Sequence, residues 1–199
     1  WPRVGEAVLL EDYLRQPMTS HQRDELRFLP RMEAAIFVNP KGEPFTGFRA
    51  SWPDGTIIFT LLPDDLVPIA AEFKHGVEAV GLILPGGKVV KGEDLHSCAK
   101  REFKEETGIV LEDAVLLNPG GTPVSQRQST ERVYFFLGAP RLPLVIEPPK
   151  LDQGEFLKVV VMPLGDWLEL VSRGRDLVDP HSVLLTFLAL RQLGRLEFR

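Results

Sequence analysis

Residues 87–109 read GKVVKGEDLHSCAKREFKEETGI, and no other stretch of the 199-residue chain is as informative. Four glutamates, one arginine and two of the glycines stand in it at fixed spacing: Gly87, Glu93, Arg101, Glu102, Glu105, Glu106 and Gly108. The last three glutamates fall within little more than one helical turn. The stretch therefore concentrates negative charge on one short segment.

The same stretch predicts a helix over about residues 95–107. Asp94 or a neighbouring residue is suited to cap its start, and Gly108 supplies a stop at its end. At about 100° per residue, Glu102, Glu105 and Glu106 lie within one arc of about 100°. Neighbouring like charges each cost roughly a few tenths of a kcal/mol without compensation. This arrangement indicates that a cation is bound there.

The carboxylates favour a hard divalent cation. Oxygen-only ligands suit Mg²⁺ or Mn²⁺ far better than zinc, and Mg²⁺ prefers a few carboxylates together with substrate phosphates. Arg101 is spaced to pair with Glu105, and Gly86 and Gly87 allow a close turn that leaves a carbonyl for the metal. The alternative is a solvated acidic helix face, which is the usual meaning of a charge run. The glycine pair, the spaced Glu93 and Arg101 argue against that alternative.

Residues 87–109 match every fixed position of the Nudix box, so the chain resembles the Nudix hydrolases. The resemblance implies an α/β (α+β) fold, a Nudix-type α/β/α sandwich with a mixed sheet. It also implies Mg²⁺-dependent hydrolysis of a nucleoside diphosphate linked to another moiety. Carried over by position, the metal ligands would be the carbonyl of Gly86 and the carboxylates of Glu102, Glu105 and Glu106. Glu102 and Glu105 would also act in catalysis, with Arg101 and Glu93 as an orienting pair.

Wider similarity points to the ADP-ribose and ADP-sugar pyrophosphatases. Residues 66–87 resemble the strands that lead into the box in that branch, and residues 152–191 resemble its C-terminal half. Lys74 departs from the arginine usual there and would meet phosphate as a point charge. The loop over residues 118–131 lacks the sequence that is usual in this branch. The group that is linked to the nucleoside diphosphate therefore stays open. GDP-sugars, NADH and dinucleoside polyphosphates remain alternative substrates, and a non-catalytic ligand sensor remains an alternative function, against which the intact box argues.

Composition limits the function classes. The chain is 44% hydrophobic with a net charge of −5 and a pI near 5.5, and it shows no basic stripe, which argues against nucleic acid as a partner. Its single cysteine, Cys98, excludes an internal disulfide and favours a reducing cytoplasm. We expect Cys98 to be a small buried spacer. No apolar run reaches the length of a membrane span and no leader opens the chain, so we expect a cytoplasmic protein that acts on a small nucleotide.

The N-terminal part predicts an extension. Residues 5–29 read as helical, with Thr19 and Gln22 spaced as a capping box. Apolar runs at 33–38, 45–52 and 56–62 predict an antiparallel meander. We therefore expect an extension over residues 1–62, built of helices and antiparallel strands, and a Nudix hydrolase domain over 63–199. The resembling branch forms dimers through such an extension, which implies a homodimer.

The remainder predicts alternating strands and helices. Asp179 and Pro180 begin a last helix that runs to about Leu193. Further strands are expected at 66–74, 77–85, 110–117, 132–138 and 156–162. The chain shows no internal repeat.

Side chains outside the box are candidates for substrate contact. In the resembling branch an N-terminal aromatic residue stacks on the nucleobase; Trp52, beside a Pro-Asp-Gly turn, is preferred here over Phe45 and Phe48. Ordinary packing is the alternative for each. Phosphate or ribose contacts are assigned to Lys74, Arg127 and Arg132, with plain surface charge as the alternative.

The general base is expected from the loop 139–155. In similar pyrophosphatases a glutamate in this region takes that role. Glu155 is the first candidate here, followed by Asp152 and Glu147, and a solvated loop acid is the alternative for each.

Overall fold

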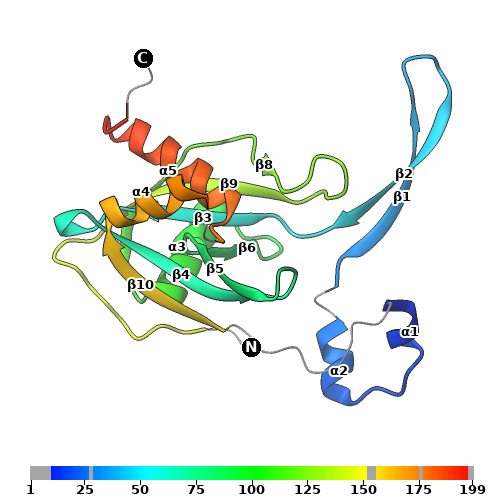
Figure 1. Ribbon diagram of the computed structural model, residues 1–199, viewed down its shortest axis with the longest axis horizontal. Coiled ribbons are helices and arrows are strands. Elements are labelled where there is room, and N and C mark those ends of the chain that lie inside the picture. Colours follow the sequence, from blue (N-terminus) through cyan, green and yellow to red (C-terminus); the bar gives the residue numbers. More distant parts are fainter. Residues whose placement is uncertain (1–9, 27–28, 152–155, 175–176, 197–199) are drawn as a thin grey trace. The chain divides into compact units, whose positions relative to one another are not determined.

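The structure is a computed structural model that describes residues 10–26, 29–151, 156–174 and 177–196 (Figure 1). The chain divides into two compact units, one formed by residues 1–52 with 125–130 and the other by 53–124 with 131–199. Residues 53–62, which we expected in the extension, belong to the second unit. Among the helices in the described ranges, none combines the length and apolar character needed to cross a membrane.

The first unit begins with two short helices, α1 (Leu10–Leu14) and α2 (Ser20–Glu25). Within residues 10–26 the expected helical character is therefore found in two short helices. Pro17 lies between the two helices, and a proline lacks the N–H that a continuous helix needs. The capping box is confirmed: the Gln22 N–H donates to Thr19 Oγ1 over 3.2 Å, and the Thr19 N–H donates to Gln22 Oε1 over 2.9 Å. The rest of the expected helix lies outside the described residues.

The first unit also contains an antiparallel ribbon of β1 (Arg31–Val38) and β2 (Pro44–Ser51). The segment 125–130 joins its end, because the Ala50 N–H donates to Gln128 O over 2.7 Å and the Thr130 N–H donates to Ala50 O over 3.0 Å. One face of the ribbon carries no charged side chain. This apolar ribbon face consists of Met32, Ala34, Ile36, Val38, Pro44, Thr46, Phe48 and Ala50.

The second unit is built around a mixed sheet with the order β6-β3-β9-β7. Its strands are β3 (Gly55–Thr60), β6 (Gly86–Lys88), β7 (Leu111–Leu116) and β9 (Arg132–Pro140), and the short β8 (Thr122–Pro123) also pairs with β9. Strand β3 runs parallel to β9 and antiparallel to β6. The expectation that this segment is the third strand of an N-terminal meander is therefore wrong.

A second sheet has the order β10-β4-β5, formed by β4 (Leu66–Lys74), β5 (Ala79–Ile83) and β10 (Leu157–Pro163). The one-turn helix η2 (Pro63–Asp65) precedes β4, and three longer helices complete the unit: α3 (Leu95–Thr107), α4 (Leu164–Arg173) and α5 (Pro180–Gln192). From residue 66 onward, the predicted strands and helices agree with these bounds to within two residues at each end.

Alternation along β3 and β9 divides the core between two faces of the mixed sheet. Ile58 and Phe136 pack with Phe103 of α3 on one face. Phe59 and Phe135 pack on the other face with Trp167 of α4 and with residues of α5 and β4. The mixed α/β fold expected from the sequence is confirmed. Helix α3 docks through its apolar side, which leaves the acidic side for the candidate site.

Candidate active site

Helix α3 carries the acidic residues of the motif, and its ends are set by local sequence. Asp94 Oδ1 accepts hydrogen bonds from the N–H groups of His96 and Ser97, both over 3.0 Å. Gly108 ends the helix in the left-handed conformation with φ of 72°, and its N–H donates to Lys104 O. The predicted cap and stop are both confirmed.

Arg101 is the centre of an ion-pair network. Its Nε and Nη2 donate to the two oxygens of Glu93, both over 2.8 Å. Its Nη1 donates to Glu102 Oε1 over 2.9 Å and to Glu105 Oε2 over 2.8 Å. The side chains of Glu93 and Glu102 are only 17% and 13% exposed, so solvent screens these pairs less than it screens surface pairs. One guanidinium group thus holds carboxylates from both the loop and the helix.

Glu106 fastens α3 to strand β6. It is 5% exposed, and its Oε2 accepts a hydrogen bond from the Gly86 N–H over 3.0 Å. The buried carboxylate is therefore held beside the glycine strand.

Gly86 and Gly87 are required by close approach of their neighbours. A Cβ at Gly87 would lie 2.4 Å from the carboxyl carbon of Glu102, and a Cβ at Gly86 would lie 2.0 Å from Thr56 O. The missing side chain of Gly87 lets β6 approach Glu102 of α3, and the missing side chain of Gly86 lets β6 approach the main chain of β3. The structure thus brings together Gly86, Glu93, Arg101, Glu102, Glu105 and Glu106.

The electrostatics of this cluster keep Glu93 and Arg101 charged. The hydrogen bond from Arg101 lowers the pKa of Glu93, and the same bond raises the pKa of Arg101. Cys98 behaves differently, because burial raises the pKa of its thiol to about 11 and keeps it neutral. Its Sγ lies 3.5 Å from Thr56 Oγ1 at zero exposure, as expected for a buried spacer.

Comparison with known proteins identifies the family. Residues 54–186, more than half of the chain, match the model of the NUDIX domain. The chain belongs to the NUDIX domain family. The matched range of this NUDIX domain begins just before β3 and ends within α5.

Individual relatives share less than a third of their residues with this NUDIX domain protein over the aligned ranges. The chain is 28% identical over 143 residues to an ADP-ribose pyrophosphatase of Bacillus subtilis (strain 168), which covers 72% of this chain and 75% of that relative. It is 31% identical over 116 residues to an ADP-ribose pyrophosphatase of Saccharomyces cerevisiae, covering 53% of this chain and 48% of that one. The crystal structure of an ADP compounds hydrolase superposes with a TM-score of 0.70 at 23% identity, over 85% of this chain and 90% of the other. That likeness shows a shared fold.

The acidic turn of the NUDIX domain fits a divalent cation by its chemistry. Its donors are carboxylate and carbonyl oxygens, and Gly87 leaves open the space beside Glu102 that a Cβ would fill. Within the described ranges, however, no group of three or more His, Cys, Asp or Glu side chains is arranged to hold a metal ion as it stands. Glu102 and Glu105 each accept a hydrogen bond from Arg101 Nη1 through one carboxylate oxygen.

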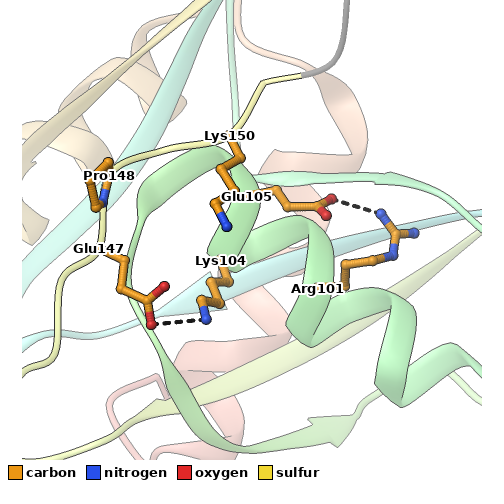
Figure 2. Close-up of a pocket in the computed structure, with 6 residues that line it drawn as sticks. All are labelled: Arg101, Lys104, Glu105, Glu147, Pro148 and Lys150. Carbon is orange, nitrogen blue, oxygen red and sulfur yellow. Dashed lines mark hydrogen bonds and ion pairs between the residues drawn. The ribbon is translucent and has the colours of Figure 1, made fainter.

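A cavity of about 150 Å³ lies beside Glu105 in the NUDIX domain (Figure 2). One wall is α3, through Arg101, Lys104 and Glu105, and the other is formed by Glu147, Pro148 and Lys150. Lys104 Nζ lies 2.9 Å from Glu147 Oε1. The cavity combines charges of both signs on the flank of the predicted metal site.

The other predicted site residues have different surroundings. Lys74, at the end of β4, is paired with Glu72, and Arg132 Nη1 donates to the carbonyls of Gly120 and Gly121 over 2.8 and 3.1 Å. Trp52 and Arg127 belong to the first compact unit. Glu155 and Asp152 lie outside the described residues. Glu147, the third candidate base, is the partner of Lys104.

Lys104 and Lys150 were missed as parts of the site. Lys104 occupies a variable position of the motif, and Lys150 follows two prolines in a loop, so neither carries a local signal. Only the return of the chain along α3 brings them to the same cavity. His181, in α5 and not among the residues that line this cavity, forms an ion pair that the sequence did not indicate: its Nδ1 lies 3.7 Å from Asp179 Oδ1.

Proposed function

We propose that this NUDIX-domain protein hydrolyses the diphosphate bond of ADP-ribose or a related ADP-sugar and releases AMP and a sugar phosphate. The observation that carries the proposal is the acidic turn of α3 beside Gly86 and Gly87, where Arg101 holds two carboxylates of the helix together with that of Glu93 in the preceding loop. The names of the Bacillus subtilis and Saccharomyces cerevisiae relatives, both ADP-ribose pyrophosphatases, support this substrate class.

The proposed cofactor is Mg²⁺, with Mn²⁺ as a substitute. Glu102, Glu105, Glu106 and the carbonyl of Gly86 would hold it, because oxygen donors around an open helix face suit these ions. When bound, such an ion polarises the phosphoryl oxygens and supplies an activated water.

The side chains of the chain supply positioning and proton transfer. Arg101 and Glu93 orient the acidic turn, and Glu102 and Glu105 complete the proposed catalytic set. Glu155 is the proposed base that takes the proton from the attacking water. Lys74, Arg132, Arg127 and Trp52 are the proposed substrate contacts, with Lys74 as a point charge for phosphate and Trp52 as a stacking surface.

We further propose a homodimer that uses the apolar ribbon face. This face is free of charge, and its Ile36 and Phe48 are 77% and 68% exposed, which is typical of a surface that a partner covers. The opposite face carries the ion pair of Arg49 with Glu33 and the stacked rings of Phe37 and Phe45. A second copy of the chain is the proposed partner. A cytoplasmic location is supported by the single, buried thiol of Cys98.

The test is a panel of nucleoside diphosphate derivatives incubated with Mg²⁺ or Mn²⁺, with products resolved by chromatography. We expect ADP-ribose or an ADP-sugar to be cleaved fastest, and Glu106→Gln to lower the rate by several orders of magnitude while the thermal unfolding curve stays cooperative. Preferred cleavage of a GDP-sugar, NADH or a dinucleoside polyphosphate would correct the substrate class. Absence of turnover across the panel would favour a ligand sensor.

A further inference from the structure

The segment that follows β9, residues 141–150, runs along the C-terminal end of α3; we call it the strap. The Glu147 N–H donates to Gly108 O over 2.7 Å, and the Lys150 N–H donates to Glu105 O over 2.7 Å. Ile146 forms an antiparallel bridge with Ile109. Carbonyls in the last turn of a helix have no partner within the helix. The strap therefore provides a donor for the carbonyl of Glu105.

Gly108 allows the strap to pack against the end of α3, and we call this position the seat of the strap. A Cβ at this position would lie 1.9 Å from Glu147 O, so any other residue would collide with the strap main chain. Gly174 ends α4 in the same left-handed conformation, with φ of 60° against 72° for Gly108, but nothing lies within 4 Å of its Cβ position. Gly108 is thus needed for the strap contact in addition to the end of the helix.

Side chains add to this main-chain docking. Lys104 and Glu147 form their ion pair across the strap and α3, and Figure 2 shows Lys150 on the strap side of the cavity beside Glu105. On its other side the same helical turn is held by the bond from Gly86 to Glu106. The turn that carries Glu105 and Glu106 therefore forms hydrogen bonds with both β6 and the strap.

We propose that the strap positions the metal-binding turn of α3, with Gly108 as its seat and Glu147 and Lys150 as its contacts. These residues act through Glu105 and its neighbours, so they are positioning residues. Supporting contacts of this kind hold metal ligands in geometry, and their loss weakens metal binding. The inference rests on the proposed function for the role of Glu105 and Glu106 as metal ligands.

The test compares two glycines by measuring Mn²⁺ binding to the full chain by calorimetry, without substrate. Gly108→Ala and Gly174→Ala place the same strain in the backbone at a left-handed position, but only the first pushes against the strap. We expect Gly108→Ala to weaken Mn²⁺ binding about tenfold and Gly174→Ala to change it less than about twofold. Hydrogen exchange at the amides of Glu147 and Lys150 should accelerate only in the first variant.

A charge exchange tests the ion pair and does not depend on Gly108→Ala folding. We expect Glu147→Lys to weaken Mn²⁺ binding by about two- to fivefold, and the double variant K104E/E147K to restore it. Asp65→Asn breaks a comparably exposed pair with Arg195 at the end of η2 and should have no effect. This control separates loss of the strap contact from loss of any surface ion pair.

The proposal would be overturned by equal Mn²⁺ affinities in the two glycine variants, or by a double variant that binds as weakly as Glu147→Lys. Faster exchange at the strap amides with unchanged Mn²⁺ affinity would do the same. A wild-type chain that binds no Mn²⁺ would instead refute the metal site of the proposed function, which makes the two failures distinguishable.

Discussion

Arg101 and Glu93 form a bidentate pair in which both carboxylate oxygens of Glu93 lie 2.8 Å from guanidinium nitrogens. Glu93 precedes the cap of α3 and Arg101 lies within the helix, so the pair ties the loop to the helix. The remaining nitrogen of the pair's guanidinium reaches Glu102 and Glu105. The loop, the helix and the proposed metal ligands are therefore coupled through one side chain.

Replacement of Arg101 by lysine should uncouple the loop, helix α3 and the proposed metal ligands. An ammonium group lacks the planar fork, so Glu93, Glu102 and Glu105 would compete for one point charge. We expect Arg101→Lys to lower kcat by about 10- to 100-fold with a cooperative unfolding transition retained. Steady-state kinetics and circular dichroism would measure both. Arg195→Lys, at the bidentate pair with Asp65, is the matched control, and a kcat of Arg101→Lys near the wild-type value would contradict the coupling.

Gly87→Ala should disturb the acidic turn by steric displacement. Its Cβ would lie 2.4 Å from the Glu102 carboxyl group, so that side chain must leave its present position. We expect activity to fall at least about tenfold, with a weaker response to Mg²⁺, since a proposed ligand is displaced. Gly76→Ala is the control, because nothing lies within 4 Å of its Cβ position. Equal activities of the two variants would show that Glu102 tolerates displacement.

Stability should depend on pH through His181. The Asp179 carboxylate, 3.7 Å from Nδ1, raises the pKa of His181, as does the main chain at Pro123. A raised pKa means that the folded state binds the proton more tightly than the unfolded state. The contribution of His181 is therefore fully present below the unfolded value of 6.5 and is lost as pH rises through the higher folded value. As the pH rises from about 6 to 9, the stability of His181→Gln, measured by thermal unfolding, should fall less than that of the wild type. Parallel curves for the two proteins would refute this assignment.

The apolar ribbon face should control the oligomeric state. A glutamate in place of Ile36 would bury a charge in the proposed interface, which is costly. We expect Ile36→Glu to convert a dimer into a monomer by light scattering, whereas Ala35→Glu, on the opposite face, should leave the dimer intact. A wild-type monomer, or a dimer that persists in Ile36→Glu, would reject this face as the interface.

Local signals explain which elements could be predicted from the sequence. Asp94, Gly108 and the helical period lie within one short stretch, so the bounds of α3 follow from nearby residues. The partners of β3 could not be found in this way, because Gly55 pairs with both Lys88 and Val133, far along the chain. The capping box of Thr19 and Gln22 is a local signal of the same kind, because its two residues lie only three positions apart.

In the candidate site, too, the contacts within the motif could be predicted and the contacts with distant segments could not. The bond between Glu106 and Gly86 lies within the reach of the motif, and the motif indicated both residues. The strap contact between Glu147 and Gly108 depends on a chain return after β9, for which the sequence has no local mark. Residues that act at long range were therefore the ones missed.

The parallel pairing of β3 with β9 has a consequence for synthesis on the ribosome. The central strand has only the short β6 as a neighbour until residues 132–140 have left the exit tunnel. A nascent chain that ends before this point contains every proposed carboxylate of α3. It lacks strand β9, which completes the sheet against which the helix packs. Such a truncated product should be unable to form the catalytic unit, and assembly should wait for contacts between distant parts of the polypeptide, which are slow to form.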